Sequence, residues 1–76
     1  MPSQPMSKPI KRRELIRRFR ALGWQGPEPG RRHMVMRLGE RTVPIPNPHG
    51  GGELDWSLVK RILAQAGIEP IHWENV

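Results

Sequence analysis

The sequence contains no cysteine, no tyrosine and only one phenylalanine. Without thiols the chain can form neither a disulfide framework nor a thiolate zinc site. Its three histidines are too scattered to provide metal-ligand spacing. With 76 residues, the chain has room for one domain with a thin core. Such a domain must be held by packing alone, or partly by docking on a partner. We expect neither a metal nor a small-molecule cofactor.

Long apolar runs are also missing. No stretch approaches the roughly 20 apolar residues that a transmembrane helix needs. The opening segment MPSQPMSKPI has three prolines and one lysine but no apolar run, unlike a secretory signal. The sequence therefore predicts a cytoplasmic protein without membrane association. Residues 1–10 are expected to form a flexible tail, and residues 11–76 a single domain.

Acidic residues are few beside the basic ones. Seven Asp and Glu stand against thirteen Lys and Arg, which gives a net charge of +6. Arginine is much commoner than lysine, and its planar guanidinium suits bidentate contacts with phosphate. This balance is typical of proteins that bind nucleic acid, an anionic membrane surface or an acidic protein. Composition alone leaves these three partners open.

Apolar periodicity predicts one helix towards each end of the domain. Residues 11–22 carry a single apolar stripe, and Gly23 is suited to end that helix. Asp55 is a good N-cap for a second amphipathic helix over residues 56–66, and Gly67 follows where a helix-ending glycine belongs. Each helix has one face that needs an apolar surface to cover it.

Between these helices the sequence has the features of strands. A weak strand is expected at residues 24–25, with Trp24 as a core anchor rather than a platform for stacking bases. HMVMRL (33–38) and RTVPIP (41–46) predict a hairpin. Its second strand should lie at an edge, because its prolines cannot donate ladder hydrogen bonds. The glycine-rich segment 47–53 is interpreted as a connector and not a phosphate cradle, since no P-loop lysine accompanies it.

The order of these elements predicts an α+β fold of the form α-β-β-β-α. A three-stranded antiparallel sheet with both helices on one face is the simplest way to bury two amphipathic stripes. Double-stranded-RNA-binding domains have this order, although a fold alone does not assign a function. After the second helix, Ile68, Ile71 and Trp73 are expected to pack back onto the core.

One short segment brings together groups that suit RNA cleavage. In Gly30-Arg31-Arg32-His33 an imidazole follows two guanidinium groups. Histidine can serve as acid or base near neutral pH, and the arginines can stabilise negative charge that develops on a phosphate. We therefore hypothesise attack by the ribose 2′-hydroxyl, with His33 as the catalytic residue that moves the proton. On residue type alone His33 is a candidate, because histidines at strand starts are more often ordinary surface residues.

The remaining histidines are interpreted as structural. His49 lies in a Pro-Asn-Pro-His turn that it is expected to shape, although an acid–base pair of His33 and His49 stays open. His72 is interpreted as a packing or surface residue. The candidate RNA-binding residues are Arg12, Arg13, Arg31, Arg32 and Arg37.

Four segments together resemble one family of proteins. ELIRRFRALGW, GRRHMVM, VPIPNPHGG and LVKRILAQAGI occur in the order and spacing of HicA-like toxins, and the resemblance covers about residues 10–74. It implies a fold like the double-stranded-RNA-binding domain, ribonuclease activity on messenger RNA, and neutralisation by a HicB-like antitoxin that covers the active site. Our hypothesis that the cleavage is metal-independent rests instead on the residues, since no carboxylate cluster suggests a two-metal nuclease. The family's functional histidine maps to His33. Many relatives have Gly-Ser-His there, whereas Arg31 and Arg32 precede the histidine here.

Two other functions fit the same residues. A non-catalytic RNA-binding module would use the same basic surface without cutting, and an interaction protein would pair only with an acidic partner. DNA binding is disfavoured, because neither a helix-turn-helix signal nor zinc-finger spacing is present. Since few aromatic rings are available for stacking bases, RNA recognition should depend on phosphate and shape, with weak sequence selectivity.

Overall fold

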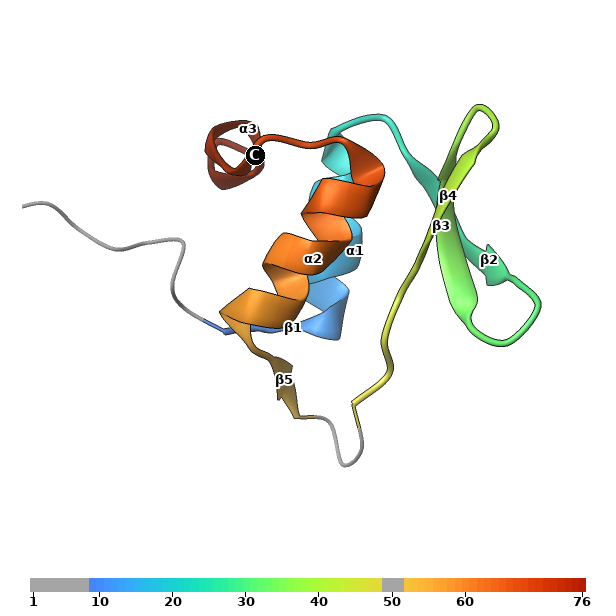
Figure 1. The fold of residues 1–76 in the computed structure, drawn as a ribbon, viewed down its shortest axis with the longest axis horizontal. Coiled ribbons are helices and arrows are strands. Elements are labelled where there is room, and N and C mark those ends of the chain that lie inside the picture. Colours follow the sequence, from blue (N-terminus) through green and yellow to red (C-terminus); the bar gives the residue numbers. More distant parts are fainter. Residues whose placement is uncertain (1–8, 49–51) are drawn as a thin grey trace, which may run out of the picture.

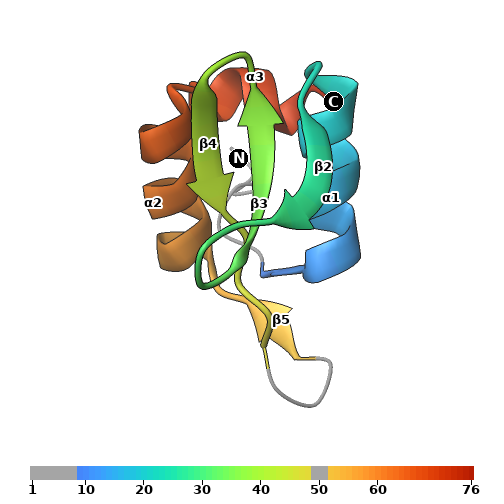
Figure 2. The ribbon, with the colours of Figure 1, turned by 90° about the vertical axis from the view of Figure 1, so that its right-hand side faces the viewer.

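A three-stranded sheet forms one layer of the molecule, and two helices that cover one of its faces form the other (Figure 1). The computed structural model describes residues 9–48 and 52–76. Figure 2 looks onto the open face of the sheet, with both helices behind it. The elements in chain order are β1 (Ile10–Lys11), α1 (Arg12–Ala21), β2 (Gln25–Pro29), β3 (Met34–Leu38), β4 (Arg41–Pro44), β5 (Glu53–Leu54), α2 (Trp56–Ala66) and α3 (Pro70–Glu74).

The main sheet has the antiparallel order β2-β3-β4. Met36 in the central strand lies opposite Val43, and both side chains are fully buried. Side chains alternate between the faces of a strand, so their neighbours Val35 and Arg37 lie on the open face. The predicted α+β fold, with an α-β-β-β-α order and both helices on one face of the sheet, is confirmed.

The core between the helices and the sheet is wholly apolar among the described residues. Phe19 lies at its centre, with the rings of Trp24 and Trp73 edge-on to it at centroid distances of 5.2 Å. Trp24 is 4% exposed, which confirms its predicted role as a core anchor. The buried residues are Leu15, Ile16, Phe19, Trp24, Met36, Val43, Ile45, Leu54, Val59, Ile62, Leu63, Ala66 and Trp73.

The ends of α2 are where the sequence predicts them. At its start the Asp55 carboxylate accepts a hydrogen bond from the Leu58 N–H at 2.9 Å. At its end Gly67 adopts a left-handed conformation with φ of 74°. The Arg41 guanidinium donates to the Ala66 carbonyl at 2.9 Å and so places a cation at the negative end of the helix. This bond also fastens α2 to β4.

Three strands differ from the predicted ones. β3 begins at Met34, one residue later than expected, so His33 precedes the strand. β2 extends over Gln25–Pro29 instead of residues 24–25, with an irregular register that accommodates its prolines. β4 ends at Pro44, two residues earlier than expected. The Ile45 N–H still donates to the Met34 carbonyl at 2.8 Å, but Pro46 has no N–H with which to continue the ladder.

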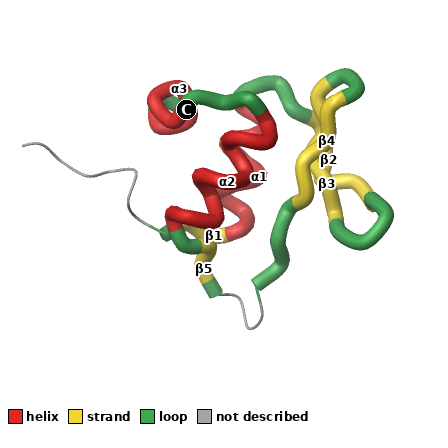
Figure 3. Tube along the Cα trace, in the orientation of Figure 1, coloured by secondary structure: helices red, strands yellow, loops and turns green. Residues whose placement is uncertain are grey.

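A second, two-stranded ladder was not expected. β1 pairs with β5, which aligns Ile10 with Leu54, and Figure 3 shows this pair apart from the main sheet. Ile10, predicted as the last residue of a tail over residues 1–10, instead pairs with Leu54 and packs against the core. Glu53, predicted within the connector, is in β5. Residues 1–8 of the tail and His49 of the turn lie outside the described residues.

The C-terminal segment folds back as the short helix α3. Trp73 is only 1% exposed, and Ile68 is partly buried against the core, as predicted. The prediction for Ile71 is wrong, because this side chain is 63% exposed. Ile71 and Trp73 are two residues apart, so a helical segment directs them to different sides.

Candidate functional site

His33 lies at the end of the loop that joins β2 to β3. The Gly30 N–H donates a hydrogen bond to the His33 carbonyl at 2.9 Å, which closes the loop. A Cβ atom on Gly30 would lie 2.6 Å from that oxygen and 2.8 Å from Val35 Cγ1. No side chain fits there without a backbone shift. The position of His33 thus depends on a glycine three residues before it.

The loop encloses a shallow hollow of about 230 Å³. Arg31, Arg32 and His33 are all exposed, so their polar groups are accessible from solvent. Within the described part of the chain, neither arginine forms an ion pair or a side-chain hydrogen bond. Two cations and an imidazole are therefore available to one ligand. The hollow is lined by Pro29, Gly30, Arg31, Arg32, His33 and Met34.

A second basic hollow, of about 320 Å³, lies at the start of α1. Arg13 is exposed there, and Lys11 precedes the helix without a side-chain cap on its first N–H groups. Asn47 adds an amide from the segment after β4. The lining residues are Lys11, Arg12, Arg13, Asn47, Pro48 and Gly52.

Arg12, predicted to bind RNA, has a partner inside the protein. Its Nε atom donates to the Pro46 carbonyl at 3.1 Å, and the side chain is half-buried. One residue earlier, the Ile45 N–H is bonded to the Met34 carbonyl beside His33. The segment between β4 and β5 is thus fastened to α1 on one side and to the His33 loop on the other.

Arg37, also predicted to bind RNA, lies on the open face of the sheet. Its Nη2 atom is 2.9 Å from Glu28 Oε2 and 3.2 Å from Gln25 Oε1. The hydrogen bond from Arg37 lowers the pKa of the Glu28 carboxyl group. The structure therefore does not bring Arg37 together with His33.

Several other arginines join elements of the fold. Arg17 and Arg18 donate to the Glu14 carboxylate at 2.7 and 2.9 Å, and Arg18 also donates to the Trp73 carbonyl at 3.0 Å. These hydrogen bonds lower the pKa of Glu14 to about 2. Arg20 reaches the Gly26 carbonyl at 2.9 Å. Sequence could not show that Arg18 joins α1 to α3, because the Trp73 carbonyl that accepts from it lies 55 residues away in the chain.

Lys11 and Asn47 are site residues that sequence reasoning missed. Both belong to segments that it had singled out, Lys11 to the basic start of the first predicted helix and Asn47 to the Pro-Asn-Pro-His turn. No periodic pattern relates two segments so far apart, so only the fold brings them into one hollow.

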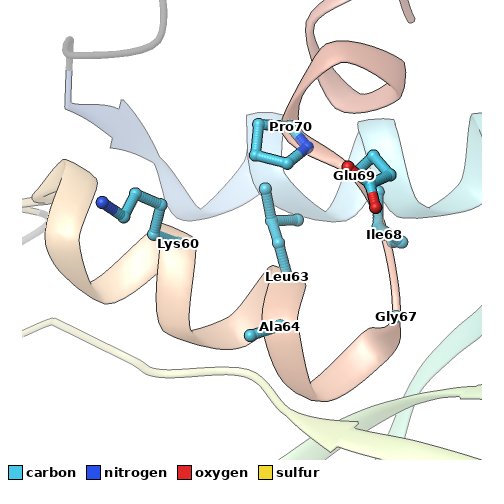
Figure 4. A pocket seen from close by; sticks show the side chains of 7 residues that line it. All are labelled: Lys60, Leu63, Ala64, Gly67, Ile68, Glu69 and Pro70. Carbon is cyan, nitrogen blue, oxygen red and sulfur yellow. The ribbon is translucent and has the colours of Figure 1, made fainter.

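Another hollow, of about 480 Å³, lies between α2 and the link to α3 (Figure 4). It has one cation and one carboxylate, Lys60 and Glu69, and no imidazole. It therefore lacks the groups that suit RNA cleavage. His72 lies in α3 at the end of the molecule opposite the β2–β3 loop (Figure 1). The lining residues are Lys60, Leu63, Ala64, Gly67, Ile68, Glu69 and Pro70.

Residues 9–48 and 52–76 contain neither a metal-ligand cluster nor a membrane-spanning helix. No group of three or more His, Asp or Glu side chains there is arranged to hold a metal ion. No helix in this part of the chain is long and apolar enough to span a membrane.

Comparison with known proteins identifies the family. The family described as HicA toxin of bacterial toxin–antitoxin systems matches residues 12–68. Neither a curated protein nor a solved structure matches the chain significantly. The matched span contains α1, the whole main sheet and α2, and therefore the His33 loop, but ends before α3. Because the match covers most of the chain and agrees with the observed fold, the protein belongs to the HicA toxin family.

Proposed function

We propose that this HicA-family toxin is an endoribonuclease that cleaves messenger RNA at the Gly30–His33 loop. The observation that carries the proposal is an exposed imidazole beside two exposed guanidinium groups in one hollow. Family membership gives the toxin role and, in general, a cognate antitoxin. The chemistry of the loop supports RNA as the target, since it combines a proton-transfer group with phosphate-binding groups.

The proposed reaction is attack by a ribose 2′-hydroxyl on the adjacent phosphorus. His33 accepts the 2′ proton as the O–P bond forms, and the bond from phosphorus to the 5′ oxygen breaks. The leaving oxygen takes a proton from the His33 imidazolium or from water, which leaves a 2′,3′-cyclic phosphate and a 5′-hydroxyl. Arg31 or Arg32 contacts the phosphoryl oxygens, whose negative charge increases in the transition state. The proposal requires no metal ion.

Recognition in this proposal relies on phosphate and shape. The rings of Phe19, Trp24 and Trp73 are buried in the core, and Trp56 is partly buried against it. None of the four is a free platform on which an extruded base could stack. We therefore expect weak sequence selectivity on purified RNA.

The proposed partner is a HicB-like antitoxin that covers the His33 hollow. A ribonuclease active on cellular RNA in the cytoplasm must be restrained, and the exposed Arg31 and Arg32 suit an acidic surface on such a partner. Addition of the antitoxin should stop cleavage by occluding the loop.

The test is RNA cleavage by the purified protein in EDTA. We expect the parent protein to cut, and His33→Ala to be slower by about 100-fold or more, as for loss of a general acid–base group. His72→Ala is the matched control and should cut like the parent, since this histidine is exposed at the opposite end of the molecule. Far-ultraviolet circular dichroism establishes that the variants fold.

Three results would change the assignment. RNA that is bound but intact in every sample would favour a non-catalytic RNA-binding module. Cleavage only without EDTA would contradict a metal-independent reaction. A loss in His49→Ala equal to that in His33→Ala would indicate a pair of catalytic histidines.

A further inference from the structure

The hollow at the start of α1 is a concentrated positive site separate from the His33 loop. Lys11 and Arg13 are exposed around it, and no ion pair to either is found among the described residues. Asn47 adds an amide that can donate a hydrogen bond. With a volume of about 320 Å³, the hollow has room for a phosphate group, and none of the residues that line it has an aromatic ring on which a base could stack.

Both basic hollows lie at the same end of the molecule. Figures 1 and 2 each show the β2–β3 loop and the start of α1 at the lower end, with the chain after β4 passing between them. Hydrogen bonds fix this intervening chain at both sides, from Ile45 to Met34 and from Arg12 to Pro46. The chain between the two hollows is therefore bonded to β3 on one side and to α1 on the other, which suits two contacts on one polymer.

We infer that the Lys11–Arg13–Asn47 hollow binds a second backbone phosphate of the RNA whose scissile phosphate lies at His33. The inference rests on the proposed ribonuclease function and specifies its substrate as a strand long enough to reach both hollows. Arg13 and Lys11 contact the phosphate oxygens, and the Asn47 amide donates to one of them. Arg12 acts as a positioning residue, because its Nε–H is already donated to Pro46.

A nearby carboxylate gives the inference a second, opposite test. Glu53 lies opposite Lys11 in the β1–β5 ladder, so the two side chains extend from the same face of the pair. Glu53 is exposed and reduces the positive potential that a phosphate would meet at the hollow. Its neutralisation should therefore strengthen RNA binding, whereas loss of the cations should weaken it.

The experiment measures binding of single-stranded 2′-O-methyl RNA, which cannot undergo attack by a 2′-hydroxyl. Affinity is measured over a series of salt concentrations for the parent and Lys11→Ala/Arg13→Ala. If each cation contacts a phosphate, the variant should bind the RNA more weakly than the parent. The slope of log affinity against log salt concentration should also fall in magnitude by about one unit per cation lost. The matched control is Lys60→Ala/Arg61→Ala, which removes the same charge from exposed positions on α2.

We expect the slope to fall in the Lys11/Arg13 variant and to stay near the parent value in the Lys60/Arg61 control. Glu53→Gln should bind the same RNA more tightly than the parent. Equal losses in the two double variants would overturn the inference, because net charge alone would then explain binding. Weaker binding by Glu53→Gln would also overturn it.

Cleavage assays separate this inference from the proposed function. The Lys11/Arg13 variant should have a raised KM on long RNA, whereas the Lys60/Arg61 control should keep the KM of the parent. A parent protein that binds RNA with the expected slopes but never cuts would refute the ribonuclease proposal and retain the phosphate site. Normal cleavage and unchanged KM in the variant would refute the phosphate site alone.

Discussion

At the scale of single residues, the arginines divide into those that hold the fold and those left accessible to a ligand. Arg12 and Arg37 were both predicted to bind RNA, yet one donates to a backbone carbonyl and the other pairs with Glu28. Arg31 and Arg32 remain exposed beside His33. Sequence could identify the basic segments, but the acceptors lie 34 and 9 residues away in the chain and are supplied by the fold.

Gly30 provides a prediction at this scale. Gly30→Ala places a methyl group 2.6 Å from the His33 carbonyl oxygen, so the loop must shift. Such overpacking should lower the free energy of unfolding by about 1–3 kcal/mol. The rate of RNA cleavage should fall by more than the loss of folded protein explains, because His33 and its two arginines move together. Urea unfolding and initial cleavage rates measure the two effects.

Gly39→Ala is the matched control for that variant. Gly39 is in the turn between β3 and β4 with φ of 61°, where a Cβ atom meets nothing within 4 Å. The left-handed conformation still makes alanine unfavourable, so stability should fall without a shift of the His33 loop. If both variants lost cleavage in proportion to stability, a specific role for Gly30 would be contradicted.

At the scale of secondary-structure elements, α3 lies beyond the residues that match the family but completes the core. Trp73 packs edge-on against Phe19, and Arg18 donates to the Trp73 carbonyl while its guanidinium lies 5.7 Å from the centre of the Trp73 ring. α3 thus covers the C-terminal end of the apolar stripe of α1. Its five residues carry too little periodicity for sequence to fix which side chain turns inwards.

Trp73→Ala should therefore destabilise the protein strongly. Loss of a buried tryptophan typically lowers the free energy of unfolding by about 3–5 kcal/mol. Ile71→Ala in the same helix is the control, and its effect should stay within about 0.5 kcal/mol because the side chain is mostly exposed. Urea unfolding followed by circular dichroism compares them. Similar effects for the two variants would mean that α3 does not pack as described.

At the scale of the whole molecule, an apolar core is surrounded by a basic surface whose ion pairs respond to acid. No polar or charged residue is buried among those described. Within α1, Glu14 forms ion pairs with Arg17 and Arg18. Arg18 also donates to the Trp73 carbonyl and so connects this network to α3. The hydrogen bonds from Arg17 and Arg18 lower the Glu14 pKa from 4.5 to about 2. Folding therefore favours the ionised carboxylate.

The lowered pKa of Glu14 determines how the free energy of unfolding changes with pH. Stability from Glu14 is fully present above pH 4.5, the ordinary value, and is lost as the pH falls towards about 2, the folded value. Glu14→Gln should lower the free energy of unfolding by about 1 kcal/mol at most near neutral pH, since the carboxylate is partly exposed. The difference from the parent should shrink in acid. A difference that grew as the pH fell would contradict the network, and urea titrations at several pH values decide between these outcomes.

Much of the architecture could be predicted from sequence because its signals are local and periodic. The two long helices, the Asp55 cap and the β3–β4 hairpin each arise from patterns within a dozen residues. The β1–β5 ladder has only two residue pairs, too short for alternation to be recognised. The residues of the Gly30–His33 loop were predicted as one group. The position of the Lys11 hollow relative to this loop could not be predicted, because it depends on hydrogen bonds that Ile45 and Arg12 make with distant residues.

The two ends of the molecule also differ in their suitability for attachment of a label or a tether. The C-terminus lies beside α3, at the end away from both basic hollows (Figure 1). A fluorescent label or surface tether attached after Val76 would therefore leave the β2–β3 loop facing solution. Attachment ahead of Ile10 would place the same group near the Lys11 hollow, because β1 leads directly into α1. Immobilised through its C-terminus, the protein would present the end that carries both basic hollows to single-molecule binding assays.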